Sequence, residues 1–252
     1  MSFAVSAAAY DRFMGRFSGP LAVAFADWVG VAPGMRVLDV GSGPGALSAA
    51  LVERVGPGTV AAVDPMPDFV EALRERLPGV TAAVAGAEDL PHADGIFDAA
   101  LANLVVSFMT DPHAGVAEMA RVTRPGGTVA ATVWQHADGI GPLTPFWRGV
   151  RSIDPTVAGE DTMVGAARGQ LATLLGECGL GDVREGALEV SVEFDHVDTW
   201  WEPFTYGVGP AGAFLAAQTA ERQEQIRAAC AELLGPPPFA VVGQAWCAAG
   251  TV

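Results

Sequence analysis

The chain has 252 residues, which is enough for one large domain or a domain with a cap. Half of its residues are hydrophobic and only 17% are charged, a composition that excludes a disordered chain and is typical of a globular protein. The net charge of −15 would repel nucleic acid and anionic membrane surfaces, although such a charge can also serve solubility alone.

Cysteine usage and the longest uncharged runs narrow the class of protein further. Cys178, Cys230 and Cys247 are odd in number and widely spaced, so we expect neither a disulfide framework nor a metal site. Residues 1–5 have no basic region ahead of an apolar segment, so no secretory signal is expected. Glycines and prolines interrupt the runs 203–220 and 233–252, which predicts no membrane span. These features favour a cytoplasmic protein.

Before the first expected strand, residues 7–26 carry two helical patterns around Ser-Gly-Pro at 18–20. Tyr10, Phe13 and Met14 share one face of the first helix, because they are spaced by three and four residues. This face can either pack on the core or bind a ligand, and the pattern does not separate the two roles.

The stretch 37–45 reads as a buried strand that breaks into a glycine-rich turn, and a helical pattern follows at once. Glycine lets the backbone turn with positive φ and approach a ligand closely. The next strand, expected at residues 59–63, ends on Asp64, which is placed to bind a ribose hydroxyl pair. The geometry suits both NAD and S-adenosylmethionine (SAM), since each carries an adenosine.

The segment LDVGSGPG at residues 38–45 resembles motif I of the class I SAM-dependent methyltransferases, with Asp39 two residues before Gly41. The resemblance continues through Asp64, the loop at 85–91, the strand at 97–102 and the Arg-Pro-Gly-Gly turn at 124–127 before a strand at 128–134. It therefore covers roughly residues 30–134, and the set of five matches is more specific than any one of them.

The resemblance implies that an N-terminal helix folds over the cofactor through Tyr10, Met14 and Arg16. Many relatives carry an acid at the position of Gly86 to bind the adenine amino group, and here Glu88 is expected to replace it. Asn103 would lie beside the methionine part of SAM, or else cap the next helix. The expected cofactor-binding residues are Tyr10, Met14, Asp39, Gly41, Ser42, Gly43, Asp64, Pro65, Met66, Ala87, Glu88 and Asn103.

A helix is expected at about 112–122, before the strand at 128–134. Beyond residue 134 the pattern predicts helices at 145–153 and 166–178, then a strand through 188–194. A helical insertion at 198–204 and 210–234 precedes a last strand at 239–246. We therefore expect an α/β, Rossmann-like, doubly wound seven-stranded sheet whose seventh strand is antiparallel, with N-terminal helices and a helical insertion between the last two strands. The whole chain, 1–252, would be one domain with a SAM-binding core at 30–134 and helical caps at 135–180 and 195–238.

Methyl transfer needs alignment of the acceptor, exclusion of water and, for some acceptors, a base. His136 follows a strand at the ligand edge and is the first candidate base, although a surface loop is the alternative. Glu202 is the second, since burial among aromatic residues would raise its pKa. Glu160 and Asp161 are the third. The expected acceptor pocket, or alternatively the core of a lid, comprises Trp134, Trp147, Trp200, Trp201, Phe204 and Tyr206.

The sequence thus predicts a SAM-dependent methyltransferase that releases S-adenosylhomocysteine (SAH) and modifies an O, N or C atom of a small apolar or aromatic metabolite, such as a natural product. We expect a monomer or homodimer that does not bind nucleic acid. Two alternatives stay open: a nicotinamide-dependent oxidoreductase, and a SAM-binding member of the fold that does not methylate.

Overall fold

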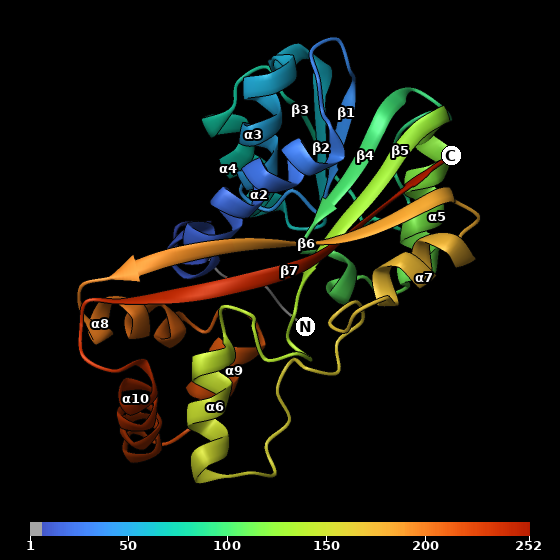
Figure 1. Cartoon of the computed structure of the whole chain (residues 1–252). Helices are drawn as coiled ribbons and strands as arrows, with labels where there is room; N and C mark the ends of the chain where they lie inside the picture. The colour runs from blue at the N-terminus through green and yellow to red at the C-terminus, as the bar shows by residue number, and fades with distance from the viewer. Residues whose placement is uncertain (1–6) are drawn as a thin grey trace.

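A computed structural model of the protein describes residues 7–252. The prediction that residues 1–5 carry no secretory signal lies outside this range. Its centre is one sheet with the strand order β3-β2-β1-β4-β5-β7-β6 (Figure 1). Only β7 runs against its neighbours, pairing antiparallel with both β5 and β6, which confirms the expected fold class. The strands are β1 (Val37–Val40), β2 (Val60–Asp64), β3 (Thr81–Val84), β4 (Phe97–Asn103), β5 (Thr123–Trp134), β6 (Gly181–Phe194) and β7 (Phe239–Thr251).

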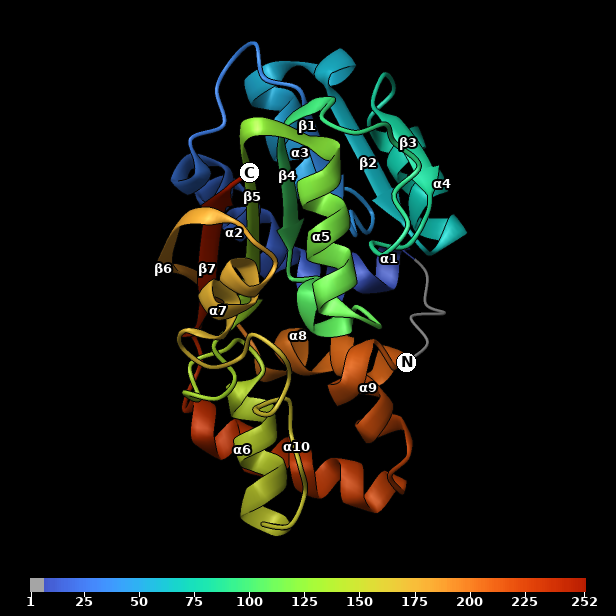
Figure 2. The ribbon, with the colours of Figure 1, turned by 90° about the vertical axis from the view of Figure 1, so that its right-hand side faces the viewer.

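Helices cover both faces of this sheet because the central strands are apolar on both sides. On one face lie α2 (Arg16–Val29), α3 (Ala46–Val55) and α4 (Pro67–Arg76), whose apolar residues pack in a shared core with Val37 and Leu101. On the other face lie α5 (Pro112–Val122) and α7 (Gln170–Glu177), in front of the sheet in Figure 2. Short 3-10 turns complete this half at Pro57–Thr59 (η2) and Val106–Phe108 (η3).

The last two strands are longer than the sequence predicted. Trp134, the last residue of β5, pairs with Ala245 of β7, whereas β7 continues to pair with β6 as far as Phe194 and Phe239. The hairpin therefore extends past the sheet, as Figure 1 shows. The expected turn at 124–127 is a bulge within β5 instead, because Thr123 already pairs with Phe97 and the register shifts before Ala99 meets Thr128.

Beneath this hairpin the inserted helices gather (Figure 1). They are α6 (Thr144–Ile153), α8 (Val197–Trp201), the 3-10 turn η4 (Glu202–Tyr206), α9 (Gly209–Ala216) and α10 (Ala220–Leu234). Helices α6 and α10 pack on each other, and their buried residues share one core with the hairpin and the N-terminal helices. The two inserted segments, far apart in the chain, thus form one helical layer.

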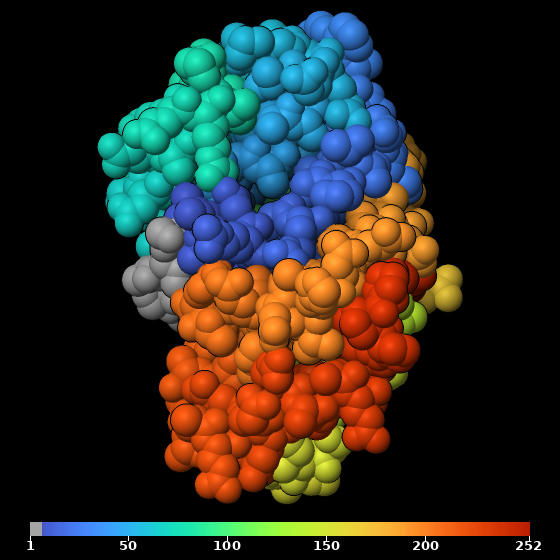
Figure 3. Space-filling model, turned by 90° about the vertical axis from the view of Figure 1, so that its left-hand side faces the viewer, coloured from blue at the N-terminus to red at the C-terminus, as the bar shows by residue number. Residues whose placement is uncertain are grey.

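The N-terminal segment consists of α1 (Ala7–Tyr10), a π-helical turn η1 (Asp11–Gly15) and then α2. The expected break at 18–20 is wrong, since α2 runs through Pro20 and the irregularity falls in η1 instead. Figure 3 shows this dark-blue segment between the cyan region that contains α3 and α4 and the orange insertion. None of the helices described in residues 7–252 is both long and apolar enough to cross a membrane.

Candidate active site

The glycine-rich loop between β1 and α3 has its predicted backbone conformation. Gly41 and Gly43 have φ of 68° and 54°, a region that side chains with a Cβ rarely adopt. A Cβ on Gly41 would lie 2.4 Å from Cγ1 of Val105, which follows β4. The loop therefore passes close to the end of β4, where the strand order reverses and open α/β sheets bind ligands.

Asp64, at the carboxyl end of β2, lies against this loop. Its Oδ2 accepts a 2.8 Å hydrogen bond from the Gly43 N–H, and its Oδ1 accepts one of 2.8 Å from the Met66 N–H. The residue is 6% exposed, and burial raises the pKa of its carboxyl group while both backbone bonds lower it. Each oxygen keeps a lone pair, so the carboxylate could also accept from a ribose hydroxyl.

Asp39 lies deeper than the loop. The Ser48 hydroxyl of α3 donates a 2.6 Å hydrogen bond to its Oδ2, while its Oδ1 is enclosed without a partner. Burial raises the pKa of Asp39 to about 7, although the bond from Ser48 lowers it. Asp39 therefore holds the start of α3 to β1, and its direct contact with a cofactor stays a prediction.

Tyr10 comes from the N-terminal segment to the same place. Its ring lies 5.5 Å from that of Phe69 in α4, and a Cβ on Gly43 would be 4.0 Å from its ring. Burial, and then the charges of Asp64 and Asp11, raise the pKa of Tyr10 to about 12. The structure thus brings together Tyr10, Gly43 and Asp64, three residues expected to hold the cofactor. Met14, by contrast, is buried in the core beneath the hairpin.

The loop after β3 follows the expectation in part. Glu88 uses its Oε1 to accept hydrogen bonds from the backbone N–H groups of Thr110 (2.8 Å) and Asp111 (3.3 Å). Its Oε2 would lie 3.1 Å from a Cβ on Gly86, so one carboxylate oxygen stands beside the position where relatives were expected to carry an acid. Ala87 is buried against α5. Pro65 and Met66 lead from Asp64 into α4.

At the end of β4, the Asn103 side chain does not cap the following turn, because η3 has no side-chain cap. Its Oδ1 accepts a 2.8 Å hydrogen bond from the Thr132 hydroxyl of β5. The next residue, Leu104, has φ of 65°, a strained backbone for a branched side chain. Thr132, which orients Asn103, and Ser48, which orients Asp39, were not predicted from the sequence. The only sequence signal for either was a polar residue on a buried face.

The candidate bases lie in different environments. His136 is half-buried, and burial lowers its pKa to about 4, so its ring is neutral but binds a proton weakly. Glu202 is exposed, which overturns the expected burial. On the surface, its Oε1 accepts a 2.5 Å hydrogen bond from the Tyr206 hydroxyl, and Arg12 of η1 in turn donates one of 3.2 Å to the Tyr206 oxygen.

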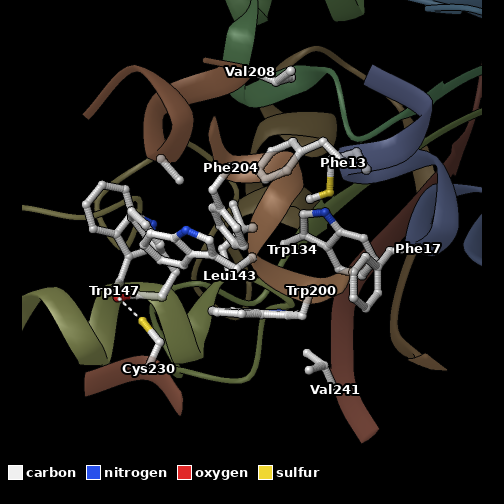
Figure 4. Packing of buried hydrophobic residues seen from close by; sticks show 14 of the residues in the cluster. Phe13, Phe17, Trp134, Leu143, Trp147, Trp200, Phe204, Val208, Cys230 and Val241 are labelled. Atoms are coloured by element: carbon white, nitrogen blue, oxygen red, sulfur yellow. Dashed lines mark hydrogen bonds between the residues drawn. The ribbon is translucent and has the colours of Figure 1, made fainter. Parts of the chain in front are cut away.

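The expected acceptor pocket is largely a core. Trp134, Trp147, Trp200, Trp201 and Phe204 are each at most 8% exposed, and Tyr206 is partly exposed. Figure 4 shows Trp134, Trp147, Trp200 and Phe204 within one packed cluster. The rings of Phe146 and Phe204 stack with centroids 4.7 Å apart. The alternative role, lid packing, therefore describes these residues, and a contact with an acceptor stays a prediction.

The residues present fit an adenosine-containing cofactor such as SAM. A glycine turn that a Cβ would obstruct, a buried carboxylate at the end of β2 and a further carboxylate after β3 converge at the carboxyl edge. No group of three His, Cys, Asp or Glu side chains that could hold a metal occurs within residues 7–252.

Comparisons with known proteins agree with this geometry. The family model described as "Methyltransferase domain" matches residues 38–131. An uncharacterized methyltransferase of Mycobacterium tuberculosis is 40% identical over 138 residues, 55% of this chain and 54% of that relative. The match thus spans about half of that relative's length. An uncharacterized protein of the same organism is 32% identical over 200 residues, 76% of this chain and 69% of the relative.

Among solved structures, a putative methyltransferase from Bacillus halodurans superposes with a TM-score of 0.59. The two share 16% sequence identity, and the superposition covers 91% of this chain and 97% of that one. At this identity the likeness concerns the fold alone. It includes the helical layer as well as the sheet, because the coverage extends well beyond residues 38–131.

Proposed function

This chain belongs to the class I SAM-dependent methyltransferase family, and from that premise we propose that it transfers a methyl group from SAM to a small-molecule acceptor. The observation that carries the proposal is the convergence of Tyr10, Gly43 and Asp64 at the carboxyl edge of the sheet. When bound, SAM supplies a methyl group already activated as a sulfonium. The protein therefore has to bind SAM, orient the acceptor toward the methyl group and exclude water.

The chain's own residues divide these tasks. Asp64 accepts hydrogen bonds from the ribose hydroxyls while the Gly43 N–H keeps its carboxylate in place. Tyr10 covers the cofactor from the N-terminal segment, and Glu88 accepts from the adenine amino group. Asn103, oriented by Thr132, binds the methionine part. Trp134 lies at the end of β5 and belongs to the aromatic core; we propose that it separates the cofactor from the acceptor.

We infer that the acceptor is a small apolar or aromatic metabolite, as in natural product biosynthesis. The Ser107 hydroxyl of η3 donates a 2.7 Å hydrogen bond to the Val164 carbonyl, which joins two segments with exposed apolar side chains. On these segments Phe108 is 40% exposed and Val164 46% exposed, which places apolar side chains near the end of β4. The charge of −15 argues against an RNA or DNA acceptor. We further propose that the protein is a cytoplasmic enzyme and acts as a monomer or a homodimer.

Titration calorimetry with SAM, SAH and NAD tests the cofactor. We expect binding of SAM and SAH in the micromolar range, about −8 kcal/mol, and none of NAD. Transfer of label from methyl-labelled SAM to a panel of phenols, amines and carbon acids tests the activity. NAD binding without SAM binding would favour the oxidoreductase alternative, whereas SAM binding with no labelled product from any acceptor class would favour the non-methylating one.

A further inference from the structure

Glu160 is a buried carboxylate that has no role in the methyl transfer as proposed above. It lies in the loop between α6 and α7 and is 5% exposed. The Trp147 indole N–H donates a 2.7 Å hydrogen bond to its Oε2. Its Oε1 has no hydrogen-bond partner in the described chain, yet it is not among the enclosed unpaired atoms such as the Trp134 N–H. One carboxylate oxygen is therefore held, and the other borders accessible space.

No cation of the described residues neutralises this carboxylate. In α6, Arg151 pairs with the neighbouring Asp161, and Arg148 reaches toward Gly139. From the end of β5 comes His136, whose pKa is lowered to about 4 and whose ring is therefore neutral. Helix α9 contributes only apolar residues. A buried acid without a cation is costly when ionised, and burial accordingly raises the pKa of Glu160 to about 7 while the Trp147 bond lowers it.

The indole that binds Glu160 is itself packed among aromatic rings. The ring of Trp147 lies 5.5 Å from that of Phe214 in α9 and 5.1 Å from that of Phe146. Aromatic faces attract cations, and a nearby carboxylate strengthens that attraction. A carboxylate bonded to the indole of an aromatic cluster therefore suits a protonated amine attached to an apolar group.

The loop that carries Glu160 also docks on the edge of the sheet where the cofactor site lies. Val164 accepts the hydrogen bond from Ser107 after β4, and Ala166 accepts one of 3.4 Å from the Ala137 N–H after β5. A Cβ on Gly165 would lie 2.9 Å from Val133 of β5. Residues 160–166 thus run from the aromatic cluster to the carboxyl ends of β4 and β5.

We propose that Glu160 binds the nitrogen of the methyl acceptor, and that this acceptor is an aromatic or aryl-alkyl amine. This inference rests on the proposed function and names its substrate class. The amine enters as an ammonium ion, and the Glu160 carboxylate takes one N–H proton. The freed lone pair attacks the activated methyl carbon, forming an N–C bond as the C–S bond breaks and its electron pair stays on sulfur. Glu160 then releases its proton to solvent.

Calorimetry with benzylammonium as the probe tests the site, on the protein with and without SAH. Glu160→Gln should weaken binding at least tenfold, because the amide still accepts from Trp147 but carries no charge. Neutral benzyl alcohol should bind both proteins alike. Glu189→Gln is the matched control, since Glu189 also accepts one 2.7 Å side-chain bond, from Gln244, but on the exposed edge of β6; it should change nothing.

The pH dependence separates binding from a merely structural role. Benzylammonium stays charged throughout, so its affinity should fall as pH drops below about 7 and Glu160 becomes protonated. Trp147→Phe keeps an aromatic ring but removes the bond that lowers this pKa, so the midpoint should move to higher pH. A structural role would lower the melting temperature without moving the midpoint. Should Glu160→Gln fail to fold, Glu160→Asp should retain the pH-dependent binding.

Two results would overturn this inference: no benzylammonium binding by the wild-type protein, or equal binding by Glu160→Gln. Either could occur while SAM binding and methyl transfer to a phenol or carbon acid persist, in which case the proposed function stands. Loss of SAM binding by the wild-type protein would instead contradict the proposed function, independently of the probe.

Discussion

At the scale of single residues, Asp64 is the contact that most directly tests the cofactor site. Asp64→Ala should weaken SAM binding by about 1–3 kcal/mol, because the ribose hydroxyls lose a charged acceptor. Calorimetry measures this change, and Asp68→Ala is the control, since Asp68 is exposed in the first turn of α4. Unchanged affinity in a folded Asp64→Ala protein would move the ribose contact elsewhere.

Asp39 makes the stability of the protein depend on pH. Its folded-state pKa of about 7 lies above the ordinary value of 3.8, so the folded state holds this proton more tightly. The free energy of unfolding should therefore fall as pH rises from about 4 to about 7, by at most about 4 kcal/mol from this group.

Asp39→Asn should remove that contribution. Denaturant unfolding of both proteins at pH 4 and pH 8 measures it, and the difference cancels the other titrating groups, including His136, whose lowered pKa acts in the opposite direction. The variant should gain stability relative to the wild type at pH 8. A constant difference across the range would mean that Asp39 is ionised in the folded protein throughout.

At the scale of elements, the aromatic segment of α8 and η4 stabilises the fold by packing in the core. Trp200 is 3% exposed, and its ring centroid lies 4.9 Å from that of Phe204. Trp200→Ala should lower the free energy of unfolding by about 3–5 kcal/mol, since it leaves a large cavity in the core shared by the insertion and the hairpin. Urea unfolding tests this, with Trp200→Phe as a milder change.

The sequence instead predicted that Trp200 lines the acceptor pocket. As a pocket wall, Trp200 would affect the acceptor KM with little loss of stability. A Trp200→Ala protein of wild-type stability but raised KM would restore the pocket role and contradict the burial-based expectation.

The N-terminal segment links two elements that the chain separates widely. Arg76 of α4 pairs with Asp11 at 2.5 Å, while Arg16 donates a 3.1 Å hydrogen bond to the Thr199 carbonyl in α8. The rings of Phe13 and Phe204 meet edge to face at 5.1 Å. The segment that lies against the glycine-rich loop is therefore also bonded to the insertion.

At the scale of the whole molecule, a ligand that binds only the folded state raises its stability. SAH at about 100 times its dissociation constant should add about 2.7 kcal/mol and raise the melting temperature, whereas NAD at the same concentration should not. Differential scanning calorimetry measures both. Stabilisation by NAD alone would contradict the assigned cofactor.

The acidic surface leads to a second prediction at this scale. With 14 basic and 29 acidic side chains, the protein should show no salt-sensitive binding to tRNA or duplex DNA near physiological ionic strength. Fluorescence anisotropy with labelled oligonucleotides tests it. A binding constant that falls steeply with salt would reveal a basic face that the overall charge conceals.

The positions of the strands along the chain, the glycine-rich loop and the place of Asp64 could be predicted from the sequence, because each depends on local signals, whereas the fold class followed from the family resemblance. A run of buried residues, a glycine and a terminal carboxylate lie within a few positions of one another. The helix expected at about 112–122 is confirmed as α5, Pro112–Val122, and in the structure Asp111 caps its start by accepting side-chain bonds from two N–H groups.

Only the tertiary structure decided what surrounds the aromatic and titratable residues. Trp200 and Trp201 have the same sequence signature whether they line a pocket or fill a core, and burial depends on α6, some fifty residues earlier in the chain. Glu202 is exposed and bonded to Tyr206, whereas Glu160 is buried and bonded to Trp147. Long-range contacts set the solvation of a carboxylate, and no local pattern encodes them.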